Sequence, residues 1–501
     1  MNNNQRQSPF DRMNVRGKLP SLEPLSADAI RRLFAGCGDV SVEHYGLLPN
    51  EFDLFLTFAD GLCDKGKVME HFLPRLSELF RSGEIASSDD LEKKRPFLIK
   101  KLEHVDSDTL ANLVFNGNVI LYFEKWGAVY SLDLTDRPER NTEEPNTEVS
   151  VRGPRDGFIE DIHTNVALIR KRLKTPLLHY ETFILGSHTR TKVGLLYLQD
   201  TIDPKLVEDI RYRLSSVKST GVVSSAQLEE LLLDTPFTLL PLYEYTGRPD
   251  FVASSLLKGR FAILVDGSPT VLIAPSNMTY LLNTSEDANV SIHQVVFVRI
   301  IRLFSVGIAL FLPGFWVALV TYHQDQLPYI LIATMVISRQ GVPMPAPLEA
   351  LLMLLLFELF REAGLRMPTA IGQTLSVVGG LIVGQAAISA GLTAPGSLVI
   401  IAISVMGTFT IVNQSMVASI IILRIVILLF CSFLGIFGFM MMLIGVLLFF
   451  ANTRSFGVYF LEPLSPPVLK DMAKVLLRTP WRLWEGRASI LQRPSRKETD
   501  S

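Results

Sequence analysis

The chain has 501 residues, with 48 lysines and arginines against 50 aspartates and glutamates, and a formal net charge of −2. Its three cysteines, Cys37, Cys63 and Cys431, lie too far apart for a disulfide framework or a cysteine-based zinc site. We therefore expect a reducing, cytoplasmic compartment for the part of the chain that meets water.

Charged residues are nearly absent from the C-terminal part of the chain. Only ten of the acidic and basic residues lie in 299–452, and none lies in 367–423 or 425–453. Moving a charge into hydrocarbon costs ~2.5–3.5 kcal/mol, so this depletion is typical of a lipid-embedded domain. The predicted fold class is an α/β soluble N-terminal region in two subdomains, followed by an all-α polytopic membrane domain.

The N-terminal part reads as a tail, a first subdomain and a linker. Residues 1–25 are polar and lack the apolar stretch of a signal peptide, so we expect a disordered tail. Residues 26–135 predict an α/β subdomain with a capped helix at its start and a hairpin between 118–123 and 127–132. An acidic linker with two prolines follows at 136–150.

Residues 151–298 predict a second α/β subdomain. The element that the sequence predicts most clearly is a hairpin at 260–274, where Asp266 and Gly267 supply the turn. Two strands and a helix are expected before it, at 181–186, 193–199 and 204–213.

A polar turn opens the first helix of this second subdomain. It comprises Arg152, Gly153, Pro154, Arg155, Asp156, Gly157, Glu160, Asp161 and Asn165. Helix N-termini can bind anions. A structural loop that caps the helix is the favoured interpretation.

Residues 299–452 are expected to cross the membrane four or six times. Arg299 and Arg302 mark a cytoplasmic flank, and the basic tail at 453–501 indicates that the C-terminus lies on the same side. The apolar segment 348–361 carries glutamates and follows a proline-rich breaker, which favours a re-entrant or interfacial helix.

Three glutamates are the candidate ion path. Glu358 shares a helix face with Arg361 and Glu362, whereas Glu349 lies on the opposite face. Ionisable groups inside a membrane often line water-filled paths. The alternative, a helix at the membrane surface, stays open. For Arg424, a snorkelling or paired arginine is favoured over a pore residue.

Small residues predict close helix packing beyond this segment. Gly380, Gly384 and Ala387 follow the small-xxx-small pattern, which supports contacts within one subunit or between subunits. A homo-oligomer is one hypothesis that this pattern allows.

Several motifs run along the chain over roughly residues 25–480. They include Val151-Arg-Gly-Pro-Arg-Asp-Gly-Phe-Ile-Glu-Asp, Leu264-Val-Asp-Gly-Ser-Pro, Gln340-Gly-Val-Pro-Met-Pro, Phe357-Glu-Leu-Phe-Arg-Glu-Ala-Gly-Leu-Arg-Met-Pro and Ile371-Gly-Gln-Thr-Leu-Ser-Val-Val-Gly-Gly. In content and order these motifs resemble those of the GerA family, the A subunits of bacterial spore germinant receptors.

The resemblance implies a multi-pass protein of the inner spore membrane, with both termini on the core side. It implies assembly with a transporter-like B subunit and a lipoprotein C subunit, and a role in coupling nutrient sensing to ion release. We find no motif for an enzyme, a cofactor, a metal or a nucleic-acid partner. The remaining alternative is a stand-alone secondary transporter, because a broken helix at 341–347 is typical of such proteins.

Overall fold

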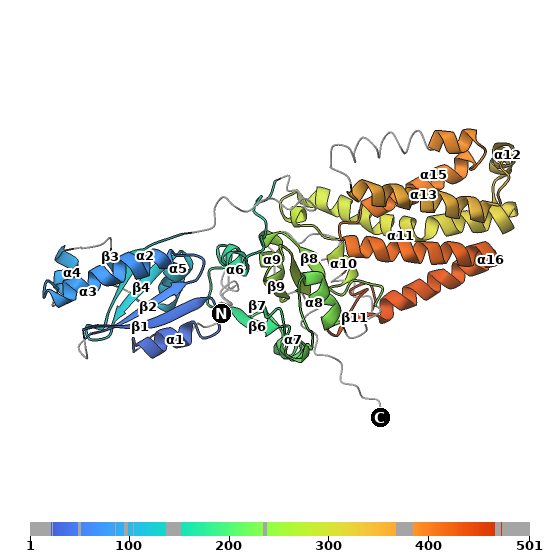
Figure 1. Cartoon of the computed structure of the whole chain (residues 1–501). Coiled ribbons are helices and arrows are strands. Elements are labelled where there is room, and N and C mark those ends of the chain that lie inside the picture. Colours follow the sequence, from blue (N-terminus) through green and yellow to red (C-terminus); the bar gives the residue numbers. More distant parts are fainter. Residues whose placement is uncertain are drawn as a thin grey trace, which may run out of the picture. The chain divides into compact units, whose positions relative to one another are not determined.

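The computed structural model describes residues 22, 24–48, 52–85, 87–94, 99–103, 105–136, 152–233, 238–366, 384–465 and 472. The chain divides into two compact units (Figure 1). The first unit contains residues 1–236, 245–275 and 485–501, and the second contains 237–244 and 276–484. Most of the predicted tail at 1–25 and linker at 136–150 lies outside the described residues.

The first sheet of the first unit is antiparallel in the order β1-β2-β4-β5-β3. Its strands, in chain order, are β1 (Val40–Leu48), β2 (Phe52–Ala59), β3 (Ile99–Lys101), β4 (Asn118–Phe123) and β5 (Ala128–Asp133). Its helices are α1 (Ala27–Leu33), α2 (Lys65–Lys67), η2 (Val68–Phe72), α3 (Leu73–Arg81), α4 (Ser88–Lys94) and α5 (Ser107–Phe115).

Helices cover both faces of this sheet. Leu54 and Leu56 of β2 belong to one apolar cluster with Leu76 of α3, and Phe55 belongs to another with Ile30 of α1. Because both faces are buried, β2 is buried continuously from Leu54 to Ala59, without the period-two alternation of a half-exposed strand. The predicted hairpin at 118–132 is confirmed as β4 and β5.

The second sheet has the order β6-β7-β9-β10-β8. Its strands are β6 (Leu178–Leu185), β7 (Thr191–Leu198), β8 (Glu244–Thr246), β9 (Phe261–Val265) and β10 (Val271–Ala274), and its helices are α6 (Ile162–Arg170), α7 (Pro204–Ser216), α8 (Ser225–Leu232) and α9 (Pro249–Leu256). The predicted hairpin at 260–274 is confirmed, with Leu272 opposite Ile263.

A buried ion pair joins the two sheets of the first unit. Arg170 is 0% exposed and donates to both carboxylate oxygens of Asp39, each at 2.6 Å. The neighbouring Cys37 donates its thiol to the carbonyls of Pro176 and Leu178. Burial raises the pKa of the Cys37 thiol to about 11, so the sulfur stays protonated and can donate.

The described part of the second unit is helical apart from a short hairpin. Its elements are α10 (Met278–Leu281), η3 (Ser285–Ala288), α11 (Ile292–Tyr322), η4 (Gln324–Gln326), α12 (Tyr329–Ser338), α13 (Ala346–Arg366), α15 (Pro395–Phe409), α16 (Gln414–Asn452), β11 (Arg454–Ser455) and β12 (Val458–Tyr459). Of the helices that the structure describes, α11 and α16 are long and apolar enough to cross a membrane. The predicted sequence of an α/β region followed by a helical region is confirmed.

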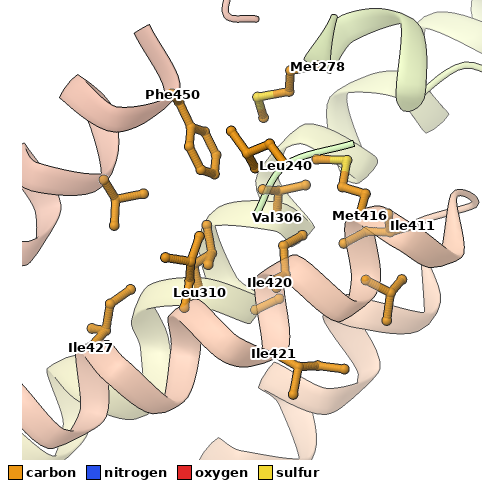
Figure 2. Packing of buried hydrophobic residues seen from close by; sticks show 14 of the residues in the cluster. Leu240, Met278, Val306, Leu310, Ile411, Met416, Ile420, Ile421, Ile427 and Phe450 are labelled. Atoms are coloured by element: carbon orange, nitrogen blue, oxygen red, sulfur yellow. The ribbon is translucent and has the colours of Figure 1, made fainter. Parts of the chain in front are cut away.

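The core of the second unit gathers residues from distant parts of the chain. Leu240, Met278, Leu310, Ile420 and Phe450 share one apolar cluster (Figure 2). The segment 237–244 therefore packs with α11 and α16 although it lies far from both in the sequence.

Three element boundaries differ from the sequence prediction. Helix α11 begins at Ile292, ahead of the predicted boundary at 299, and α13 continues to Arg366, past the predicted end at 361. The first residues of the predicted tail 453–501 are folded into the second unit, since Met278 N donates to Phe460 O at 2.8 Å. Pattern reading placed all three boundaries at changes of polarity, but helices continue wherever their backbone hydrogen bonds remain intact.

Helix α16 consists of two arms that meet at Gly435 (Figure 1). Gly435 has φ 58° and ψ −137°, which is a conformation that residues with a Cβ atom rarely adopt. A Cβ atom there would also lie 3.0 Å from His323 Cε1 and 3.1 Å from Tyr322 Cβ. The turn between the arms therefore requires glycine.

We expect Gly435→Ala to lower the free energy of unfolding by ~1–3 kcal/mol, because alanine strains this backbone conformation. Thermal unfolding of the detergent-purified chain would measure the loss. Gly445→Ala is the matched control, since Gly445 lies in the second arm with open space around it, and should be neutral or stabilising. Equal midpoints for the two variants would contradict the strained turn.

Candidate functional site

The carboxylate of Glu349 joins three helix ends in the second unit. Glu349 lies in the first turn of α13 and is 0% exposed. Its Oε1 accepts hydrogen bonds from the Thr393 hydroxyl at 2.8 Å and from the backbone N–H of Ala394 at 2.7 Å. Ala394 is the N-cap of α15, so a negative charge lies at the helix end where the macrodipole favours it.

The second oxygen of this carboxylate has an ionic partner. Arg339, the C-cap of α12, places Nη1 3.3 Å from Glu349 Oε2. Neither of these two buried atoms makes a hydrogen bond within the described part of the chain. We call Glu349, Arg339, Thr393 and Ala394 the Glu349 joint. Its carboxylate is buried within the chain.

A second buried ion pair lies on the other side of α13. Glu358 accepts from Arg424 Nη2 at 2.5 Å and from Arg361 Nε at 2.8 Å. Arg424 is 0% exposed, and its Nη1 lies 3.4 Å from Ser404 Oγ. We call Glu358, Arg361, Arg424 and Ser404 the Glu358 joint. The interpretation of Arg424 as a structurally paired arginine is confirmed.

The three candidate glutamates do not form one cluster. Glu349 contacts the ends of α12 and α15, whereas Glu358 contacts α16, in agreement with the opposite faces expected from their spacing. Glu362 pairs with Arg366 at 2.8 Å, and both side chains are exposed. Glu349 and Glu358 thus connect α13 to different helices.

The small-residue pattern is described only in part. Gly380 lies outside the described residues. A Cβ atom on Gly384 would lie 3.4 Å from Leu398 of α15, and Ala387 is buried in a cluster with Leu354 and Ile401. These two residues pack within one chain, and their role in an oligomer stays a prediction.

The side chains of the polar turn before α6 cap the helix and bind to neighbouring residues of the fold. Asp161 is the N-cap of α6 and accepts from Thr164 N at 2.8 Å. Asn165 is buried and exchanges two hydrogen bonds with the backbone of Ile159, at 2.9 and 2.6 Å. Asp156 binds Arg172 at 2.5 and 2.7 Å. These contacts favour the capping loop over an anion site.

The rest of this turn is tied to the hairpin and to α9 through backbone atoms. Glu160 O accepts from Gly267 N at 2.8 Å, and Pro154 O accepts from Arg248 Nη2 at 3.4 Å. Phe158 N donates to Gly247 O at 2.8 Å. The same turn, which belongs to no helix or strand, also contains Arg152, Gly153, Arg155 and Gly157.

Helical spacing predicted that Glu358 could pair with Arg361, which the structure confirms, but it missed the partners that lie outside α13. Arg339, Thr393 and Ser404 carry no signal of their own, because each comes from a helix or helix end distant from its partner in the sequence. The scarcity of charge in 299–452 was the usable signal, since any buried charge there needs a partner. Among the described residues, no three His, Cys, Asp or Glu side chains lie together as metal ligands.

Comparison with known proteins decides the family. The family model described as the Bacillus/Clostridium GerA spore germination protein matches residues 28–490. The chain belongs to the GerA family. The resemblance carried by its motifs is therefore confirmed.

Two relatives of this GerA chain are similar to it over most of their length. Spore germination protein XA of Bacillus anthracis is 45% identical over 465 residues, which is 92% of this chain and 94% of the relative. Spore germination protein KA of Bacillus subtilis (strain 168) is 33% identical over 429 residues, which is 85% of this chain and 79% of the relative. A solved structure, the N-terminal domain of the A subunit of the Bacillus megaterium spore germinant receptor GerK3, is also similar. The match covers 50% of this chain and 92% of the chain in that structure, with 27% identity and a TM-score of 0.36.

Two statements follow for this GerA chain. It is a spore germination protein of the A-subunit type, as its relatives are. Its relationship to the spore germination proteins, together with two described helices long and apolar enough to cross a bilayer, indicates a membrane-associated protein.

We expect Glu358→Gln to lower the free energy of unfolding by ~3 kcal/mol, because it leaves Arg424 buried without a countercharge. Thermal unfolding in detergent would measure the loss. The double variant with Glu358→Leu and Arg424→Met should recover most of it, since it removes both buried charges.

Glu362→Gln is the control for this experiment, because the exposed pair with Arg366 should contribute less than ~1 kcal/mol. A loss at Glu362 as large as the loss at Glu358 would contradict the assignment of Glu358 as the buried partner.

Proposed function

We propose that this GerA chain is the A subunit of a germinant receptor in the inner spore membrane. In this proposal a transporter-like B subunit receives the nutrient and a lipoprotein C subunit completes the complex. The A subunit spans the membrane several times with both termini on the core side, and it forms an oligomeric channel that releases ions. The names of the relatives favour this function over a stand-alone transporter.

The observation that supports ion release is that Glu349, which is buried, and Glu358, which is partly buried, each pair with an arginine. A carboxylate that lines a path raises the local concentration of cations, but a carboxylate next to an arginine does not. In the structure Glu349 has Arg339 at 3.3 Å, and Glu358 has Arg424 at 2.5 Å. We infer that this arrangement is the closed state, and that nutrient binding separates a carboxylate from its arginine.

The Glu349 joint suits such a change better than the Glu358 joint. Arg339 is 23% exposed, and α12, which it ends, has no buried residue among Tyr329–Ser338. Few apolar contacts therefore oppose a movement of this helix end. Arg424 is fully buried in α16, between two other helices, and its displacement would cost more.

Two variants of the Glu349 joint should have opposite effects on spores. Glu349→Gln keeps the acceptor for Thr393 and Ala394 but removes the charge, so nutrient-triggered release of monovalent cations should slow by ~tenfold. Arg339→Gln frees the carboxylate, so release should start earlier or at less nutrient. Flame photometry of the spore medium, with immunoblots for receptor level, would check both.

Equal receptor levels are required for this comparison, and Gly445→Ala, which lies outside the candidate ion path, is the control. If Glu349 is only a structural joint, both variants will change the receptor level in the same direction and release will follow that level. That result would overturn the assignment of Glu349 to an ion path.

The proposed topology has its own test. Cysteines introduced at positions 200 and 490 should stay unlabelled by a membrane-impermeant maleimide applied from outside, because both lie on the core side. Labelling of either position in sealed membranes of defined orientation would contradict it.

A further inference from the structure

The second sheet of the first unit has an outer edge that is only partly covered. Strand β6 is the edge strand, and in the described part of the chain its strand partner is β7. At one end, residues 36–38 bond to both the N–H and the C=O of Tyr180, at 2.9 and 3.0 Å. Just beyond the other end, Ser187 N donates to Ser219 O at 3.1 Å.

The gap between these contacts exposes main-chain groups. The N–H and C=O of Tyr180 point outward, and strand geometry repeats every two residues, so Thr182 and Ile184 point their main-chain groups the same way. No strand of the described chain covers this stretch. It is long enough to pair with a short added strand.

This gap lacks the features that usually protect a strand edge. Residues 182–185 read Thr-Phe-Ile-Leu, with no lysine, proline or charged side chain. The pairing with β7 runs without a bulge from Leu178 to Leu185. Ile184 is 68% exposed. An uncharged, regular edge with an exposed isoleucine is a site where another chain can add a strand.

A cleft lies along the same stretch. Its volume is about 600 Å³, and its lining includes Phe183, Ile184, Leu214 of α7, Lys218 and Thr220. The volume is in the range of sites that hold a few side chains of a ligand. Main-chain pairing would supply affinity here, and the cleft would select the side chains.

The charges around the gap indicate the chemistry of the occupant. Lys192 of β7 lies directly opposite Ile184 in the register and is exposed, and Lys218 lines the cleft. The nearest acidic side chain on β6, Glu181, is bound by Arg211 at 2.8 Å. The rim is therefore basic and favours an acidic segment. A second copy of this chain would bring an equally basic rim.

We propose that residues 182–185 of β6 accept an added strand from a different protein chain, with an apolar residue over Ile184 and an acidic residue beside Lys192 or Lys218. This interaction surface serves assembly with a partner. It does not depend on whether Glu349 lines an ion path, so the two hypotheses can fail separately.

The test uses the full-length chain in spore membranes, with a benzophenone amino acid in place of Ile184. After irradiation, mass spectrometry would identify the crosslinked chain and the residues attached. Thr182→Pro removes an outward N–H but leaves the bonds to β7 intact, and proline is tolerated on edge strands. Thr182→Val is the matched control, because it keeps that N–H and favours a strand.

The expected result is a crosslink to an extended, acid-containing segment of another protein, kept by Thr182→Val and reduced ~tenfold by Thr182→Pro. Lys192→Glu with Lys218→Glu should reduce the same crosslink without changing the main chain, which covers the case that the proline variant does not fold. Crosslinks only between copies of this chain, no crosslink, or equal yields in all variants would overturn the proposal.

Discussion

The ion pair between Arg424 of α16 and Glu358 of α13 buries the whole arginine side chain, and the packing of the second unit depends on this pair. An arginine that is 0% exposed on an apolar helix requires an acceptor nearby, because an unpaired charge there would cost several kcal/mol. That requirement fixes the rotation of α13 against α16. Ser404 adds a contact to the same guanidinium and donates to Ala309 O of α11 at 3.0 Å. One buried charge thereby relates α11, α13, α15 and α16.

At the Glu349 joint a buried charge again has a partner of opposite charge, but here the two carboxylate oxygens are bound unequally. Its carboxylate satisfies the N-terminal end of α15 and the hydroxyl of Thr393 through one oxygen, and the other oxygen has only the longer contact to Arg339. One oxygen of this side chain is thus held by two short hydrogen bonds, and the other by a longer ionic contact. Such an asymmetry suits a joint that opens on one side, toward α12, while α13 and α15 stay together.

The first unit contains a third buried pair, and it too connects elements that are far apart in the sequence. Arg170 ends α6, and Asp39 precedes β1, so the bidentate bond between them joins the two sheets. The guanidinium also lies 4.5 Å from the centre of the Phe115 ring, which adds a cation–π contact. In both units of this GerA chain, a buried arginine thus fixes one element against another.

The sequence by itself determined the division into an α/β region and a helical region, since charge depletion and hydrophobic periodicity are local properties of the chain. It also determined the hairpins at 118–132 and 260–274, because a short loop sets the register of two adjacent strands. The motifs of the GerA family could be recognised because they too are local properties of the chain. Glu349, Glu358 and Arg424 could be identified as charged residues within apolar segments.

Only the tertiary structure decided what those charges do. The partners Arg339, Thr393 and Ser404 come from elements whose approach depends on the packing of the whole unit, so no spacing along the chain predicts them. The hairpin of β1 and β2 was missed because both faces of β2 are buried, which removes the alternation that marks a strand. The place of residues 453–465 in the core, and the uncovered edge of β6, likewise result from contacts between distant segments, and contacts of that kind leave no period in the sequence.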